Sequence, residues 1–243
     1  RVLTTRRLNG IINGNFIVSG GTEDMKKSEI AGMIDHTLLK PAKKSQIRQL
    51  CEEALKYSFA SVCVQPDYVK ACAKLLEGSN VKICTVIGFP LGENTTATKV
   101  FETKNAIKNG ATEIDMVLNQ SWAKGNEWKK VEKEIASVVK AAAGKTVKVI
   151  LETCNLNDKQ IVKACEASVN AKATFVKTST GFGSGGAKAA DVALMNSVVA
   201  EHGLKVKASG GVRTYKDAMD MIANGASRIG TSNGIAIVEG AED

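Results

Sequence analysis

The chain has 243 residues, of which 44% are hydrophobic and 24% are charged. This composition is typical of a globular protein and excludes a disordered chain. The longest stretch without a charged residue, 8–22, contains several asparagines and glycines, so no membrane partner is expected. A formal net charge of +8 favours an acidic partner such as a phosphorylated metabolite. The basic residues are scattered and aromatic residues are few, so no nucleic-acid partner is expected either.

Histidine and cysteine usage narrows the chemistry further. The two histidines, His36 and His202, are too few for a multi-histidine zinc site, and both are interpreted as hydrogen-bonding or surface residues. The six cysteines form no CxxC pair, and several lie in apolar runs, as Cys63 does. This pattern is typical of reduced thiols, and with no recognisable secretory signal it predicts a cytoplasmic protein.

Residues 1–24 are expected to form an N-terminal extension ahead of a single domain at 25–243. Met25 resembles a natural start, and the preceding segment shows little periodicity. It is interpreted as an expression-vector remnant or a flexible tail. The alternative is a native extension that forms a small hairpin, because its two Asn-Gly pairs favour tight turns.

From Ile30 onward, short β-branched runs alternate with amphipathic stretches. The expected strands are 32–35, 60–64, 82–88, 113–118, 147–153, 174–178, 205–208 and 227–230. The expected helices are 44–57, 66–77, 95–109, 128–143, 158–171, 187–203 and 215–224. This alternation predicts an α/β fold, a single (β/α)8 TIM barrel. A doubly wound open sheet is the alternative, because periodicity does not distinguish a closed sheet from an open one.

Alternation along each strand predicts which side chains point into the barrel. If apolar residues such as Ile114 face the helices, Asp115 points inward. The same parity places Glu152, Lys177 and Lys207 inside, near the carboxyl ends of their strands, where barrel enzymes carry out their chemistry. A structural layer of ion pairs is the alternative. Because buried ion pairs often add no stability, four ionisable groups at this end favour a catalytic role.

Two lysines on neighbouring strands indicate a particular reaction. An amine attacks a carbonyl only when it is neutral, and both desolvation and a nearby cation favour the neutral form. Lys177 beside Lys207 supplies both effects, so one of them can form a Schiff base that accepts electrons during carbon–carbon cleavage. Asp115 can offset the charge of Lys207 and help to transfer protons. This set predicts an aldolase that needs no metal and no other cofactor.

Glycine-rich loops follow the last three expected strands, at 178–186, 209–213 and 230–234. Their backbone N–H groups can converge on an anion, and the loops after strands seven and eight form the usual phosphate site of a TIM barrel. Arg213 is the nearest basic side chain, although it also fits a solvated helix start. Gly181, Gly183 and Gly186 match a dinucleotide-binding fingerprint, but the downstream acidic residue is missing, so no NAD site is predicted.

Six motifs closely resemble the deoxyribose-phosphate aldolase family. In order, they are DHTLLKP at 35–41, VCVQP at 62–66, IGFPLG at 87–92, EIDMVLN at 113–119, FVKTSTG at 175–181 and KASGGVR at 207–213. The resemblance runs from about residue 34 to residue 232. It implies a class I aldolase that cleaves 2-deoxy-D-ribose 5-phosphate to D-glyceraldehyde 3-phosphate and acetaldehyde, in deoxyribose catabolism.

The resemblance also implies roles for single residues. Lys177 would form the Schiff base, Lys207 would favour its neutral amine, and Asp115 would transfer protons. The implied substrate-binding residues are Asp35 and Thr37 near the sugar hydroxyls, and Gly181, Gly210, Gly211, Ser232 and Asn233 around the phosphate. Asn233 departs from the family pattern, which often has two serines at the last pair.

Other functions stay open at this point. The first is a related Schiff-base aldolase for another phosphosugar, and the second is a barrel that binds a phosphosugar without catalysis. Nucleic-acid binding through the basic surface is the third. A homodimer is compatible with the sequence, which does not fix the oligomeric state.

Overall fold

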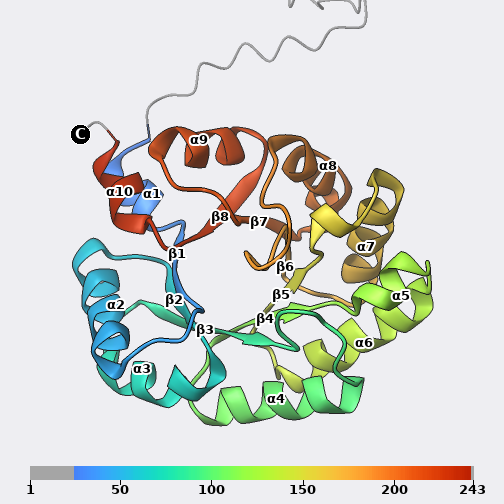
Figure 1. The fold of residues 1–243 in the computed structure, drawn as a ribbon, viewed down its shortest axis with the longest axis horizontal. Coiled ribbons are helices and arrows are strands. Elements are labelled where there is room, and N and C mark those ends of the chain that lie inside the picture. The colour runs from blue at the N-terminus through green and yellow to red at the C-terminus, as the bar shows by residue number, and fades with distance from the viewer. Residues whose placement is uncertain (1–24, 242–243) are drawn as a thin grey trace, which may run out of the picture.

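The computed structural model describes residues 25–241, and its eight strands form a closed parallel barrel in sequence order (Figure 1). The strands are β1 (Ile34–Leu38), β2 (Ser61–Val64), β3 (Lys82–Ile87), β4 (Glu113–Val117), β5 (Thr146–Ile150), β6 (Phe175–Lys177), β7 (Lys205–Ser209) and β8 (Ala226–Thr231). The predicted TIM barrel is confirmed, and the open-sheet alternative is wrong. The interpretations of residues 1–24 concern a segment outside the described residues.

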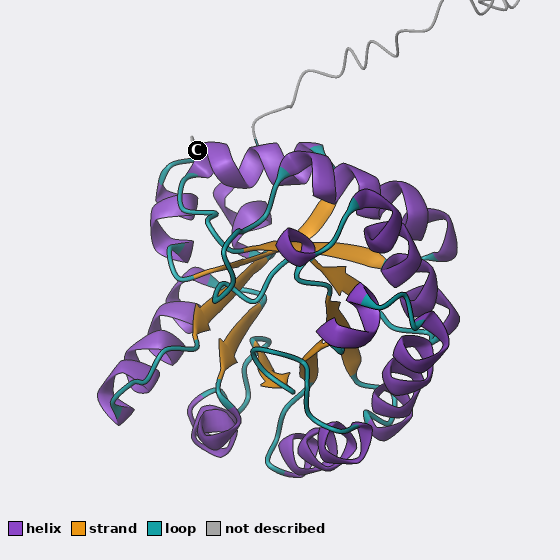
Figure 2. Cartoon of the chain, turned by 45° about the vertical axis from the view of Figure 1, so that its right-hand side comes forward, coloured by secondary structure: helices purple, strands orange, loops and turns teal. Residues whose placement is uncertain are grey.

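Helices surround the barrel (Figure 2). They are α1 (Lys27–Ala31), α2 (Lys44–Tyr57), α3 (Val69–Leu75), α4 (Thr96–Lys108), α5 (Gln120–Lys124), α6 (Trp128–Ala141), α7 (Asp158–Asn170), α8 (Ala189–Val199), α9 (Tyr215–Ala223) and α10 (Gly234–Glu239). Short 3-10 turns lie at Pro66–Tyr68, Thr153–Asn155 and Ala200–His202. Between residues 25 and 241, no helix combines the length and the apolar character that crossing a bilayer would require.

The main core lies between the strands and the helices. Helix α6 shows the pattern, because Val131, Ile135 and Val138 fall on one face and are fully buried. The strands contribute their outward-facing side chains to the same layer, including Ile114 and Val149. With this apolar layer outside the sheet, the other parity of each strand faces the barrel interior. The predicted strand parity is confirmed.

The structure differs from the predicted elements mainly at the first strand. The expected strand 32–35 begins instead at Ile34, because α1 precedes it and a turn follows in which the Met33 N–H donates to the Ile30 carbonyl at 2.9 Å. As a result, Asp35 lies inside β1 rather than at its end. Helices α1, α5 and α10 were not expected, since five or six residues are too few to show a helical period.

Candidate active site

Three predicted catalytic side chains meet inside the barrel. The pairing of β6 with β7 places Lys177 beside Lys207. The Lys177 Nζ donates to Asp115 Oδ2 at 2.8 Å, and the Lys207 Nζ donates to the same oxygen at 2.8 Å. Lys207 and Asp115 are fully buried, and Lys177 is 3% exposed. One carboxylate oxygen therefore bridges the two amino groups.

Asp35 holds the other side of Lys207. Its Oδ2 accepts from the Lys207 Nζ at 2.5 Å, and its Oδ1 accepts from the Ser61 hydroxyl at 2.6 Å. The Arg228 guanidinium donates to the same Oδ1 at 2.6 Å. Because Asp35 is fully buried and has these partners, it fixes the Lys207 amine. Its predicted contact with the sugar hydroxyls stays a prediction.

The acidic and basic side chains beneath Lys177 form a layer, here called the charge layer. Two of its members, Lys148 and Arg228, were not predicted from the sequence. The Lys148 Nζ lies 2.5 Å from Glu113 Oε2 and 2.9 Å from Asp115 Oδ1. Arg228 lies 3.3 Å from Glu113 and reaches Asp35 as well. The strand parity contains the signal for both, because Lys148 and Arg228 each precede a core residue that faces the helices. A layer of opposite charges thus supports the site from below.

The charge layer fixes the ionisation of four groups. Burial raises the pKa of Asp115, but Lys148, Lys177 and Lys207 lower it well below its usual range. Burial likewise raises the pKa of Asp35, but the positive charges of Lys207, Lys148 and Arg228 outweigh burial. The net result is a pKa well below the ordinary value. Burial lowers the pKa of Lys148 and of Lys207, yet the carboxylates raise both above the ordinary value. The two aspartates are therefore carboxylates at neutral pH, and Lys148 and Lys207 are ammonium groups.

These shifts predict how the protein responds to acid. The unfolded chain takes up protons near the ordinary aspartate pKa of 3.8, whereas folded Asp35 and Asp115 do not. Their contribution to stability is therefore present above that pH and declines as the pH falls below it. In the folded protein at about pH 4, close to the reference aspartate pKa, the carboxyl carbons of Asp35 and Asp115 should keep carboxylate NMR shifts. Protonation of either carboxyl group at that pH would contradict the expectation.

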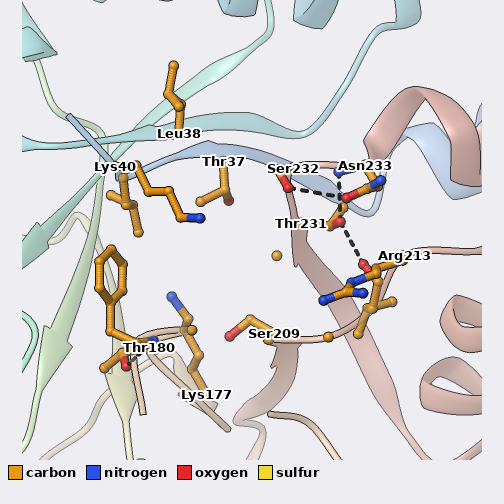
Figure 3. Close-up of a pocket in the computed structure, with 17 residues that line it drawn as sticks. Thr37, Leu38, Lys40, Lys177, Thr180, Ser209, Arg213, Thr231, Ser232 and Asn233 are labelled. Atoms are coloured by element: carbon orange, nitrogen blue, oxygen red, sulfur yellow. Dashed lines mark hydrogen bonds between the residues drawn. The ribbon is translucent and has the colours of Figure 1, made fainter. Parts of the chain in front are cut away.

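A cavity of about 310 Å³ opens above the charge layer. Residues at the carboxyl ends of β1, β6, β7 and β8 line it, and the Lys177 amine points into it (Figure 3). The predicted substrate-binding residues that line the cavity are Thr37, Gly181, Gly210, Gly211, Ser232 and Asn233. Asp35, Asp115 and Lys207 lie beneath it and do not line it. The structure thus brings the predicted residues together at one end of the barrel.

The glycine loops that edge this cavity are in close contact with each other. Gly210 and Gly211 have φ angles of +85° and +83°, a conformation that favours glycine. A side chain at Gly186 would meet the Gly210 carbonyl oxygen at 2.2 Å, so the loops after β6 and β7 approach backbone to backbone. The Thr231 hydroxyl donates to the Val212 carbonyl at 2.7 Å and joins the loop after β8 to them. Together the loops form a rim rich in backbone N–H groups, here called the glycine rim.

Glu152, which was predicted to point inward, fixes one of these loops. Its backbone has a φ of +54°, and its side chain is 4% exposed. One carboxylate oxygen accepts from the Thr180 N–H at 3.2 Å, and the other accepts a short hydrogen bond from the Thr180 hydroxyl. The Thr180 hydroxyl in turn accepts from the Phe182 N–H at 3.0 Å. Glu152 therefore holds the backbone on both sides of Gly181.

Within the described part of the chain, two groups have metal-like donor spacing, and they share Cys84. One adds Cys63 and Asp115, and the other adds Asp35 and Glu113. The Lys148 Nζ lies 3.3 Å from the Cys84 sulfur and makes the short contacts to Glu113 and Asp115 described above. Because an ammonium group already sits among these donors, they fit an internal ion-pair layer better than a divalent cation.

Comparison with known proteins identifies the family. Residues 29–239 match the model of the DeoC/LacD family aldolases. The chain belongs to this family. The deoxyribose-phosphate aldolase of Caldanaerobacter subterraneus subsp. tengcongensis is 57% identical over 223 residues, which cover 88% of this chain and 96% of that protein. The Bacillus cytotoxicus enzyme of the same name is 59% identical over 211 residues, covering 86% of this chain and 94% of that one.

A solved structure shows the same relationship. The deoxyribose phosphate aldolase from Aeropyrum pernix, described as a unique tetramer, has a TM-score of 0.83 and 37% identity to this aldolase. The match covers 88% of this chain and 91% of that one. The protein is thus an enzyme, a carbon–carbon lyase of the aldolase type, and the predicted family is confirmed.

Proposed function

We propose that this aldolase cleaves 2-deoxy-D-ribose 5-phosphate to D-glyceraldehyde 3-phosphate and acetaldehyde through a Schiff base on Lys177. The relatives named above carry the name of this substrate. The observation that carries the mechanism is the position of the Lys177 amine. It points into the cavity and shares Asp115 Oδ2 with the buried ammonium group of Lys207. A carbonyl substrate bound in the cavity would therefore meet the Lys177 Nζ as its nucleophile.

The first chemical step is imine formation. The neutral Lys177 amine attacks C1 of the open-chain sugar, and its nitrogen lone pair forms the C–N bond while the carbonyl oxygen takes up a proton. The carbinolamine then loses water and becomes an iminium ion. The buried ammonium group of Lys207 lies beside the attacking amine, and both contact Asp115 Oδ2 at 2.8 Å.

Carbon–carbon cleavage follows from the iminium ion. The C3 hydroxyl loses its proton, and its electrons form the carbonyl of D-glyceraldehyde 3-phosphate as the C2–C3 bond breaks. The electron pair of that bond becomes the C1–C2 double bond of an enamine, and the π electrons of the C–N bond move to the nitrogen. Asp115 accepts this proton through a hydroxyl or a water molecule, since its carboxylate lies beneath the cavity and does not line it. C2 of the enamine then takes up a proton, and hydrolysis releases acetaldehyde and the free amine.

The glycine rim binds the phosphate in this proposal. Gly181, Gly210 and Gly211 line the same cavity as Ser232 and Asn233, so backbone N–H groups and polar side chains are available there. Such N–H and side-chain donors bind an anion by hydrogen bonding alone and need no metal ion. The Asn233 N–H is already donated to the Thr231 hydroxyl at 2.9 Å, so Asn233 would contribute through its side-chain amide.

Borohydride trapping tests the proposal. The aldolase is incubated with acetaldehyde, reduced with borohydride and digested, and its peptides are mapped by mass spectrometry. We expect one reduced adduct, on Lys177. An adduct on another lysine, or none, would exclude Lys177 as the nucleophile. A Lys177→Ala variant that keeps a ligand-dependent function would instead support a non-catalytic phosphosugar-binding barrel.

A panel of phosphorylated sugars tests the substrate. Cleavage of 2-deoxy-D-ribose 5-phosphate should exceed that of other phosphosugars, and the opposite order would favour the related Schiff-base aldolase. Deoxyribose catabolism in the cytoplasm and a homodimeric assembly belong to the same proposal. The tetramer of the Aeropyrum pernix relative supports self-association, and size-exclusion chromatography with light scattering would measure the oligomeric state.

The loop contact made by Glu152 predicts an effect on phosphate binding. Glutamine at this position keeps the shape but loses one of the two oxygens that accept from Thr180. We expect Glu152→Gln to raise KM for the phosphorylated substrate about threefold to tenfold, since the lost charged hydrogen bond loosens the loop at Gly181. Trapping with acetaldehyde should remain as in the unchanged enzyme. A loss of trapping with no change in KM would contradict this role.

A further inference from the structure

The charges around the cavity are all of one sign. Its lining residues include the basic side chains of Lys40, Lys177 and Arg213, and no aspartate or glutamate is among the residues that line it. The Lys177 amine already contacts Asp115. The other two cations face the cavity without a carboxylate in its wall. The cavity is therefore built for an anion, and Lys40 has no role in the mechanism above.

The position of Lys40 is fixed by the chain around it. It lies in the loop between β1 and α2, directly after the buried Leu39. The Gln65 side-chain amide donates to the Leu39 carbonyl at 2.9 Å. Two residues beyond Lys40, the Tyr68 hydroxyl donates to the Ala42 carbonyl at 2.6 Å. The backbone is thus held on both sides of Lys40, and its side chain extends from an anchored point.

The side chain of Lys40 itself is directed at the cavity. Figure 3 shows its amino group pointing into the cavity on the same side as Thr37, above the Lys177 amine. Arg213 extends from the opposite wall, where the loop after β7 lies. Lys40 makes no hydrogen bond or ion pair with any residue from 25 to 241. An ammonium group that lines a cavity without a partner is available for a ligand.

We propose that Lys40 is a substrate-binding residue that contacts the anionic end of the substrate and, with Arg213, determines the preference for a phosphorylated sugar. The inference rests on the function proposed above and adds a side-chain cation to the backbone donors of the glycine rim. A phosphate monoester carries close to two negative charges at neutral pH. Two cations on opposite walls match that charge, and charge-assisted hydrogen bonds to phosphate are stronger than neutral ones.

The test compares two substrates and three variants. Lys40→Ala removes the cation, and Lys40→Arg keeps the charge. Lys44→Ala is the matched control, since Lys44 is exposed, begins α2 and does not line the cavity. Each protein is assayed for kcat and KM with 2-deoxy-D-ribose 5-phosphate and with unphosphorylated 2-deoxy-D-ribose, and for borohydride trapping with acetaldehyde.

We expect Lys40→Ala to raise KM for the phosphate ester about tenfold or more, the size expected for losing one charged hydrogen bond. Its kinetics with the unphosphorylated sugar should match the unchanged enzyme, so the preference between the two substrates falls by the same factor. Lys40→Arg should restore most of the preference, and Lys44→Ala should keep it. Added salt should raise KM for the phosphate ester less in Lys40→Ala, because screening then acts on one cation fewer.

Two outcomes would overturn the proposal. An equal loss with both substrates would show that Lys40 acts on the uncharged part of the sugar or on the fold. Unchanged kinetics with the phosphate ester would show that Lys40 is only solvated. Acetaldehyde carries no charge, so trapping does not need Lys40. A failure to trap Lys177 in the unchanged enzyme therefore counts against the proposed function, and not against the role of Lys40.

Discussion

Replacing Lys177 by methionine is expected to lower kcat for aldol cleavage by about 10⁴-fold or more, since covalent catalysis loses its nucleophile. Lys177 is the lysine that both lines the cavity and contacts Asp115. Methionine fills a similar volume and cannot form an imine. Lys177→Arg should be equally inactive, because arginine keeps the charge but its guanidinium stays protonated. Single-turnover cleavage assays and borohydride trapping measure both effects.

Lys207→Met is the matched comparison for this prediction. It removes the buried cation that bonds to both Asp35 and Asp115, but it leaves the Lys177 nucleophile in place. We expect a large loss of activity together with a slower reduced adduct that still maps to Lys177. An adduct on Lys207 in the Lys177→Met variant would reverse the two assigned roles. Near-UV circular dichroism on each variant separates loss of chemistry from loss of fold.

The positions of the candidate catalytic side chains could be predicted because they depend on local sequence. Alternation along a strand is a property of neighbouring residues, so Asp115, Lys177 and Lys207 could each be placed inside the barrel from their own strands. Their closeness followed from the order of parallel strands. The contacts of Asp35 could not be predicted in the same way. They depend on where β1 begins, and the turn after α1 moves the start of that strand by two residues relative to the expectation.

Features that depend on loops and long-range packing were harder to predict from the sequence. Glu152 was placed near the site by parity, but its left-handed backbone and its two contacts with Thr180 follow from the path of the next loop. Lys40 was identified only as part of a motif, because the backbone on either side of it is held by two side chains from the segment after β2. The contacts of such residues can be identified only from the folded barrel.

A buried lysine in α4 likewise could not be predicted from the sequence, since a lysine in a helix is usually solvent-exposed. Lys99 is fully buried and donates to Glu134 Oε2 at 2.8 Å. It also donates to the Gly92 carbonyl at 2.7 Å and to the Val117 carbonyl at 2.9 Å. The Lys99 amine thus joins α4 and α6 to the loop after β3 and to the end of β4, two residues beyond Asp115.

Lys99→Met is therefore expected to lower the free energy of unfolding by about 3–5 kcal/mol, because it leaves the buried Glu134 carboxylate unpaired. Burial already raises the pKa of Glu134, and Lys99 partly opposes this, so without Lys99 the carboxyl should bind a proton more readily in the folded state. A group whose pKa is raised by folding stabilises the protein at low pH and loses that contribution as the pH rises through the folded value. The destabilisation should consequently be smaller near pH 5 than near pH 8, values on either side of a Glu pKa raised from its ordinary range.

The double variant Lys99→Met with Glu134→Leu separates the ion pair from the packing. Because an apolar pair of similar volume often replaces a buried ion pair without loss, we expect it to recover most of the stability that the single variant loses. Urea unfolding at the two pH values measures all three proteins. A single variant within about 1 kcal/mol of the unchanged enzyme, the range of an exposed ion pair, would contradict a bonding role for Lys99. Full recovery of stability without recovery of kcat would show that Lys99 positions the end of β4 through its hydrogen bond to the Val117 carbonyl. Lys99 would then position Asp115, which lies on the same strand.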